Sequence, residues 1–179
     1  MQSRSLVIIV NQDRDLDLTF PHLEKNVLNP LNADLAFCGA WVNQRSLELR
    51  DKFLFDWSDS EPGDWTYALD SLSSNPNSSW RELIEFGELF GSHFLGPAVD
   101  GAISGSGAIG HYWRIHLERS IPDEVINEYD WFVITRSDWY WTIPHPFVSD
   151  LDENRIYIFS GESYGGINDR HMIIPRRHF

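Results

Sequence analysis

The sequence has little cysteine, and the apolar run near its start is short. Cys38 is the single cysteine among 179 residues, which excludes an internal disulfide and is typical of proteins from a reducing compartment. The apolar run at residues 6–10 is far shorter than the core of a secretory signal or a membrane-spanning helix. We therefore expect a cytoplasmic protein with no integral membrane segment.

Positive charge is also scarce. The chain has 14 Lys and Arg residues against 27 Asp and Glu residues, which gives a formal net charge of −13 at pH 7. Binding to nucleic acid or to an anionic membrane surface requires clustered cations, so this balance argues against both partners. Hydrophobic residues make up 42% of the chain and aromatic residues 14%, which is enough for a packed core. The length suits a single domain covering residues 1–179.

The apolar pattern predicts alternating strands and helices. Residues 6–10 form a continuous β-branched run, typical of a strand that is buried on both faces. We expect a helix that Pro21 opens and that ends near Pro30, followed by a second strand at residues 35–38. Strand, helix and strand within about forty residues predict a βαβ unit.

The alternation continues in the second half of the chain. We expect helices from Ser79, after the glycine-rich residues 101–110, and from Pro122. These elements predict an α/β fold with a central mixed, mostly parallel sheet flanked by helices. The chain stops at Phe179 with no closing helix, so we expect the native chain or domain to continue. The further strands are predicted at residues 131–135, 155–159 and 171–174.

Three polar clusters lie at predicted strand ends. They are residues 11–14, residues 136–138 and residues 168–170. Ligands of open α/β sheets bind outside the carboxyl ends of the strands. A carboxylate such as Asp138 can hold Mg²⁺ or Mn²⁺ there, and Arg136 can grip phosphate through its planar guanidinium.

Plainer interpretations stand beside these. A lone Asp138 at a strand end caps a turn or lies solvated about as often as it binds a metal, and Asn168 with Asp169 fits an Asx turn. The glycine-rich residues 101–110 lack the lysine of a phosphate loop. The aromatic residues at 131–141 pack in a core or, past the strand end, form a stacking platform. No zinc spacing is present among the histidines, which we expect to be structural or exposed: His111, His116, His145, His171 and His178.

Three segments together resemble a known family. Residues 129–138, YDWFVITRSD, resemble the "YDxVIxTRxD" strand of GT-A-type glycosyltransferases, often from surface-polysaccharide clusters. Residues 155–158 with GGINDR at 165–170 are similar to an "IYIP…GGxNDQ" loop, and the opening to residue 34 is similar to "GQxRD…PLNAD". The resemblance spans most of the chain except about residues 50–100.

The resemblance implies a GT-A-like (Rossmann-like) sheet and transfer of a sugar from a nucleotide-diphosphate donor, with UDP favoured, to a glycan or other hydroxyl acceptor. Asp138 would hold Mn²⁺ or Mg²⁺ on the diphosphate. Asp169 would be the catalytic residue, a general base if the enzyme inverts and a positioning group if it retains. The donor would be bound by Asn11, Gln12, Arg14, Arg136, Gly165, Gly166, Asn168 and Arg170.

The sequence departs from the family pattern in two places. Asn11 stands where such families often have Gly, and Asp138 is the only carboxylate kept from a DxD pair. Two alternatives therefore stay open. One is a sugar- or nucleotide-binding module without turnover, and the other is a metal-dependent hydrolase built on strand-end carboxylates.

Overall fold

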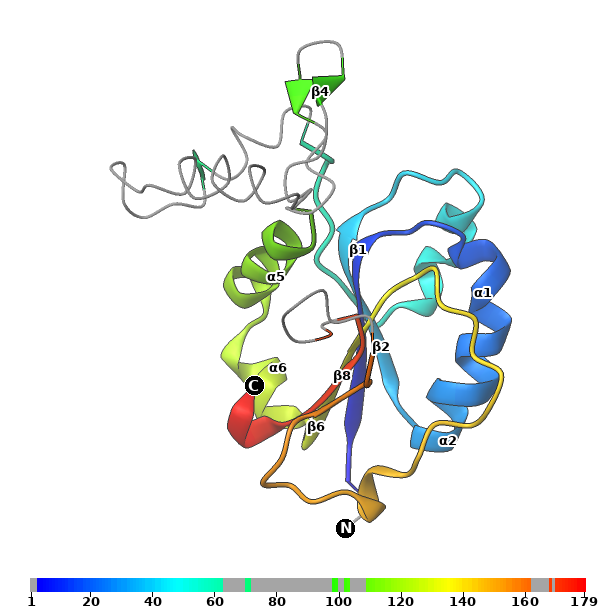
Figure 1. Ribbon diagram of the computed structural model, residues 1–179, viewed down its shortest axis with the longest axis vertical. Coiled ribbons are helices and arrows are strands. Elements are labelled where there is room, and N and C mark those ends of the chain that lie inside the picture. Colours follow the sequence, from blue (N-terminus) through cyan, green and yellow to red (C-terminus); the bar gives the residue numbers. More distant parts are fainter. Residues whose placement is uncertain are drawn as a thin grey trace.

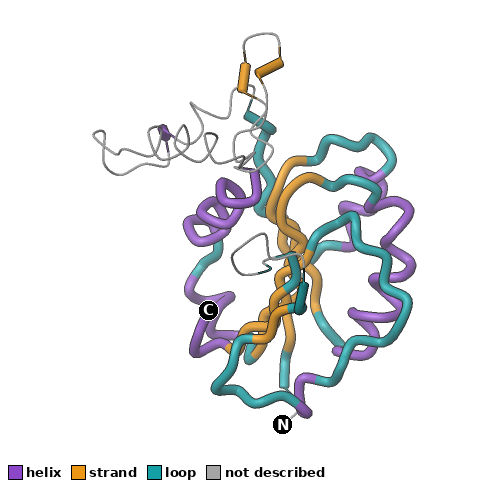
Figure 2. The backbone as a smooth tube through the Cα atoms, in the orientation of Figure 1, coloured by secondary structure: helices purple, strands orange, loops and turns teal. Residues whose placement is uncertain are grey.

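A six-stranded mixed sheet is the centre of the molecule (Figures 1 and 2). The computed structural model describes residues 3–62, 70–71, 98–99, 102–103, 109–161, 168 and 170–179. The strand order is β3-β2-β1-β6-β8-β7, in which β3, β2, β1 and β6 are parallel and β8 is antiparallel to both neighbours. The strands are β1 (Ser5–Gln12), β2 (Asp34–Ala40), β3 (Phe55–Asp56), β6 (Trp131–Thr135), β7 (Tyr157–Ile158) and β8 (Met172–Pro175).

Helices cover both faces of this sheet, which confirms the predicted α/β class with a mixed, mostly parallel sheet. In Figure 1, α1 and α2 lie on one side of the strands, and α5 and α6 lie on the other. A separate antiparallel pair joins β4 (Ala98–Val99) to β5 (Ala102–Ile103). The helical segments are α1 (Leu16–Leu23), η1 (Glu24–Leu28), α2 (Asn29–Leu31), η2 (Ser46–Lys52), α5 (Ile109–Ser120), α6 (Asp123–Glu128), η3 (Val148–Asp150) and η4 (Arg176–His178).

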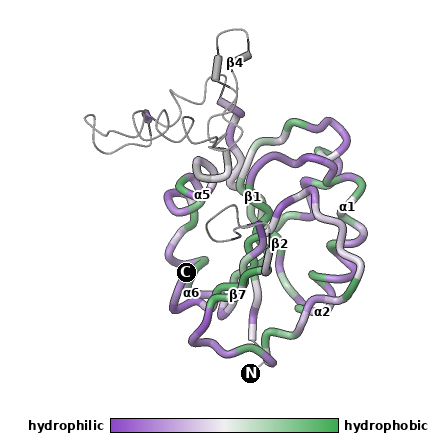
Figure 3. Tube along the Cα trace, in the orientation of Figure 1, coloured by the Kyte–Doolittle hydropathy of each residue, from purple (hydrophilic) through white to green (hydrophobic). Residues whose placement is uncertain are grey.

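Burial of β1 on both faces follows from its continuous aliphatic run. Successive side chains of a strand point to opposite faces. Leu6 and Ile8 therefore pack with Trp113 of α5, while Val7 and Ile9 pack with Phe20 of α1. Figure 3 shows the hydrophobic residues concentrated along these strands. Apolar layers thus pack on both faces of β1, and this packing fixes the position of its carboxyl end.

The first predicted helix starts earlier than expected. α1 begins at Leu16, and Pro21 lies inside it instead of opening it. Proline lacks the N–H that would bond the carbonyl four residues back, yet the helix continues into the π-helical η1. Leu16, Phe20 and Leu23 are buried, and their packing against the sheet explains why the helix continues past Pro21.

Most other predicted elements are confirmed within a few residues. The strand predicted at residues 131–135 is β6, and the helices predicted after residue 110 and from Pro122 are α5 and α6. The strand predicted at 155–159 is shorter, because the Arg155 N–H bonds the Asp152 carbonyl in a turn at 3.0 Å. The helix predicted from Ser79 lies outside the described residues. None of the helices that the structure describes is long and apolar enough to span a membrane.

Candidate functional site

The order of the strands reverses between β1 and β6. From β1 the sheet grows outward through β2 and β3, and the chain then returns to pair with the other side of β1 as β6. In open α/β sheets this reversal leaves a crevice outside the carboxyl ends of the two central strands, where ligands bind. The predicted clusters at residues 11–14 and 136–138 lie at these two strand ends.

The end of β1 has an unusual backbone. Asn11 adopts a positive φ of 101°, a conformation that side chains rarely take. A Cβ atom added to the neighbouring Gly39 would lie 1.5 Å from the Asn11 carbonyl oxygen, so only glycine fits there. The Oδ1 atom of Asn11 is buried and has no hydrogen-bond partner among the described residues. This strand end therefore combines backbone strain with a buried acceptor that lacks a partner among the described residues.

The rest of the first cluster contains two buried side chains and one exposed side chain. The side chain of Gln12 is buried, and its Nε2 donates to Glu61, whereas Arg14 is exposed. Asp13 is fully buried, and its carboxylate accepts the backbone N–H groups of Val42, at 2.8 Å, and Asn43, at 3.1 Å. Asp13 was not singled out from the sequence. It fixes the loop after β2 against the end of β1.

The second cluster is held against the first. The Ser137 hydroxyl donates to the Gln12 carbonyl at 2.7 Å, and the Thr19 hydroxyl donates to the Ser137 carbonyl at 2.5 Å. Beside them, the Arg136 guanidinium makes a two-pronged pair with Asp138, in which Nε donates to Oδ1 at 2.8 Å and Nη2 donates to Oδ2. The side chains of Arg136 and Asp138 are 33% and 23% exposed, so the pair remains accessible to a ligand.

This pairing bears on the predicted metal site. Both oxygens of Asp138 accept from Arg136, so the carboxylate is already neutralised. No group of three or more His, Cys, Asp or Glu side chains within the described ranges is arranged to hold a metal ion. The described residues therefore do not fit a preformed Mn²⁺ or Mg²⁺ centre, and metal binding at Asp138 stays a prediction.

The third cluster lies at the same edge of the sheet, because Met172 at the start of β8 pairs with Ile134 near the end of β6. Asn168 is buried, donates from Nδ2 to the Gly161 carbonyl at 2.9 Å and accepts the Arg170 N–H at Oδ1, at 3.1 Å. The latter bond is the Asx turn that the plainer interpretation predicted. The remaining predicted residues of this cluster lie outside the described residues: Gly165, Gly166 and Asp169.

Sequence reasoning missed a cation beside the first cluster. A Cβ atom added to Gly110 at the start of α5 would lie 2.9 Å from Nη1 of Arg114 and 4.0 Å from Nδ2 of Asn11. Arg114 is thus brought to the end of β1 by the packing of α5 on the sheet. The helical pattern of α5 reveals only its apolar face, so no sequence signal placed Arg114 near the site.

A pair of buried histidines is the second feature that sequence reasoning missed. Nε2 of His145 lies 3.3 Å from Nε2 of His171, and Nδ1 of His145 lies 2.8 Å from the Pro146 carbonyl oxygen. Because a carbonyl only accepts, His145 carries its proton on Nδ1, and His171 donates from Nε2 to His145. Nδ1 of His171 is then an acceptor with no partner among the described residues.

Burial keeps both imidazoles neutral. It lowers the pKa of His145, and together with the neighbouring His145 it lowers the pKa of His171 to about 3. His145 follows β6 in the chain and His171 directly precedes β8, so the pair adjoins the polar clusters.

No protein-family model matches the chain, and no curated protein matches it either.

Proposed function

We propose that this protein binds a nucleotide-diphosphate sugar, with UDP favoured, at the carboxyl edge of β1 and β6 and transfers its sugar to a hydroxyl acceptor. The observation that carries the proposal is the strand reversal between β1 and β6, which gathers the polar clusters at residues 11–14 and 136–138. The resemblance at residues 129–138 supports the same assignment.

Electrostatics also favours an anionic ligand at this edge. The chain carries a formal charge of −13, so a diphosphate requires local cations. Arg14 is exposed after β1, Arg136 follows β6, and Nη1 of Arg114 lies near Gly110, which Nδ2 of Asn11 also approaches. Guanidinium groups bind phosphate oxygens through paired N–H donors. These arginines place positive charge at this edge, and Asp138 offsets the charge of Arg136.

The reaction requires few groups from the protein. The bond between the anomeric carbon and the diphosphate oxygen breaks, the acceptor oxygen bonds to that carbon, and the acceptor proton passes to a base. In the proposal Arg136 stabilises the negative charge that develops on the departing diphosphate. Asp169 remains the predicted base or positioning residue.

One observation favours a second candidate function. Asp138 is already paired with Arg136, and no metal group is present in the described part of the chain. A nucleotide-binding module without turnover needs neither a free carboxylate nor a metal. Such a module would bind UDP through the arginines alone and leave the sugar bond intact.

Calorimetric titration with UDP and UDP-glucose, with and without MnCl₂, tests the proposal. Arg136→Gln removes the guanidinium group. We expect this variant to bind UDP roughly tenfold or more weakly, because charge-assisted hydrogen bonds contribute about 1.5–3 kcal/mol. Arg176→Gln is the matched control, since Arg176 also pairs with an aspartate, Asp130, but at the opposite end of β6. Equal affinity in wild type and R136Q would contradict the assignment of the site.

A second assay separates the two candidate functions. Release of UDP from UDP-sugars is followed in wild type, Asp138→Asn and Asp169→Asn. Turnover that both variants reduce supports the transferase. Tight UDP binding with no turnover for any donor tested would instead support the binding module.

A further inference from the structure

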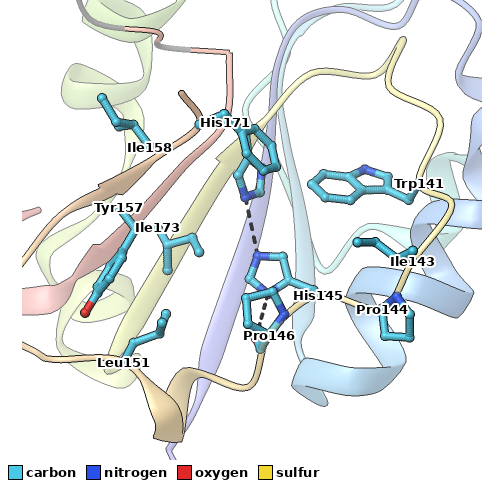
Figure 4. A pocket seen from close by; sticks show the side chains of 11 residues that line it. Trp141, Ile143, Pro144, His145, Pro146, Leu151, Tyr157, Ile158, His171 and Ile173 are labelled. Carbon is cyan, nitrogen blue, oxygen red and sulfur yellow. Dashed lines mark hydrogen bonds between the residues drawn. The ribbon is translucent and has the colours of Figure 1, made fainter. Parts of the chain in front are cut away.

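An apolar cavity of about 250 Å³ opens beside the histidine pair (Figure 4). The loop after β6 forms one wall through Trp141, and β7 and β8 form the other through Tyr157 and Ile173. His145 and His171 point toward each other from these two walls. The cavity is larger than the cavity of about 150 Å³ that binds benzene in an engineered protein.

The lining of the cavity excludes charged and strongly polar ligands. No Asp, Glu, Lys or Arg lines it among the described residues. The Tyr157 hydroxyl is already engaged by Asp152, whose N–H donates to it at 2.6 Å, and both imidazoles are neutral. A free sugar would leave its hydroxyl groups without partners on such a surface.

The mouth of the cavity is apolar as well. Ile143, Ile158 and Phe159 line the cavity, and yet they are 71%, 44% and 40% exposed. Phe147 and Ile156, close by in the sequence, are also exposed. Large apolar side chains gathered around a cavity mark a binding site more strongly than scattered ones do.

The cavity is connected to the candidate site through one side chain. Trp139 directly follows Asp138, and its ring stacks on Phe159 at 5.0 Å and on His171 at 6.1 Å between centroids. Phe159 and His171 both line the cavity. The rings of Phe159 and His171 therefore separate a ligand in the cavity from Trp139, the residue directly after Asp138.

We propose that this cavity binds an uncharged apolar group, aryl or short alkyl, that forms part of the acceptor. Its role as an acceptor subsite rests on the proposed function, whereas the binding of an apolar group does not. Because the described lining has no charged side chain, it favours a hydrocarbon group. The aromatic rings of Trp141 and Phe159 in the walls can stack against a ring of the ligand.

Calorimetric titration with three glucosides tests this inference. We expect 2-naphthyl β-glucoside and octyl β-glucoside to bind at least about tenfold more tightly than methyl β-glucoside, because burial of about 60 Å² of apolar surface contributes about 1.4 kcal/mol. Tighter binding of either apolar glucoside supports the inference and identifies the group as aryl or alkyl. Equal binding of all three, or binding of none, would overturn it.

Variants at the mouth locate the binding. Ile143 is exposed, so Ile143→Asp and Ile143→Lys leave the core intact while placing a charge beside the ligand. Both should weaken binding of the apolar glucosides, whereas the control Leu18→Asp, at a residue 64% exposed on α1, should not. Unchanged affinity in both Ile143 variants would overturn the assignment. These titrations use no nucleotide, so a failed transferase assay leaves the cavity result standing, and the reverse also holds.

Discussion

The two ends of β6 carry similar charged groups in different settings. At the amino end, Asp130 pairs with Arg176 at 3.4 Å and accepts the Arg4 N–H at 3.1 Å. At the carboxyl end, Arg136 pairs with Asp138. Each end thus has an arginine–aspartate pair, but among the described residues the strained asparagine, the apolar cavity and the buried histidine pair lie toward the carboxyl end.

Backbone hydrogen bonds are the main interactions that hold the amino end. The N–H groups of Asp130 and Trp131 both donate to the Arg4 carbonyl, and the Arg176 N–H donates to the Asp130 carbonyl at 2.8 Å. The side chain of Arg4 reaches Asp34 at 3.2 Å. Here the charges supplement a satisfied backbone, whereas at the carboxyl end side chains make the links, as Ser137 does to the Gln12 carbonyl and Arg136 does to Asp138. The difference fits our proposal that the amino edge closes the fold and the carboxyl edge binds the ligand.

The largest expected effect comes from crowding the carboxyl end of β1. In Gly39→Ala the added methyl group would collide with the Asn11 carbonyl, a backbone atom that no side-chain rotation can move. We expect a loss of about 3 kcal/mol in the free energy of unfolding, measured by urea denaturation. Ser5→Ala is the control at the amino end, where the buried Ser5 hydroxyl has no partner in the described part of the chain, and it should cost almost nothing. Equal costs would remove the contrast between the ends.

The second prediction concerns acid sensitivity. The pKa of His171 is lowered to about 3 in the folded chain from its ordinary 6.5, so between these values the unfolded chain binds more protons. Stability contributed by neutral His171 is therefore complete above pH 6.5 and falls as the pH drops toward 3. We expect a loss of about 2 kcal/mol from pH 7 to pH 5, measured by urea denaturation at each pH.

Two variants assign this acid sensitivity to one edge of the sheet. His171→Gln should reduce the fall in unfolding free energy between pH 7 and pH 5, whatever its effect on stability at pH 7. His178→Gln changes an exposed histidine after β8, at the amino end of β6, and should preserve the slope. An undiminished slope in H171Q would show that other groups cause the acid sensitivity.

A smaller effect is expected at Asp13. Asp13→Asn removes the buried charge that receives two backbone N–H groups at Oδ1, and it places an amide nitrogen where Oδ2 lies 3.2 Å from the Asn43 N–H. We expect a cost of about 1.5 kcal/mol in thermal or urea unfolding. Asp130→Asn, in an exposed ion pair, should cost less than about 1 kcal/mol. The contrast fails if Asp130 proves the more costly site.

The smallest expected effect is the loss of the ion pair at the amino end. The side chains of Arg176 and Asp130 are both 45% exposed, so solvent and salt screen their attraction. Arg176→Gln should lower stability by about 0.5 kcal/mol or less and leave nucleotide affinity unchanged. A clear fall in nucleotide affinity would place the binding site at the wrong end of β6.

Much of the sheet is predictable from the sequence because burial on both faces leaves a continuous aliphatic run. The strand predicted at residues 131–135 coincides with β6, and the polar residues after it lie at its carboxyl end. Pro21 misled because tertiary burial of the α1 face outweighs the missing hydrogen bond. Local sequence patterns predict local structure, and they fail where tertiary packing determines how far an element extends.

The candidate site was predictable only in outline. The spacing of Arg136 and Asp138 shows that they are close, but not that they neutralise each other. His145 and His171 are 26 residues apart, and a loop return brings them together. Nη1 of Arg114 and Nδ2 of Asn11 both approach Gly110 because α5 packs on the sheet. Each of these depends on the tertiary fold, which sequence spacing does not specify.

A crystal soaked with a UDP-sugar and Mn²⁺ tests the central claim most directly. The account predicts diphosphate density at the carboxyl edge, within hydrogen-bond distance of Arg136 and beside the end of β1. Density at the Asp130–Arg176 end, or a vacant carboxyl edge under conditions where the nucleotide binds in solution, would contradict it.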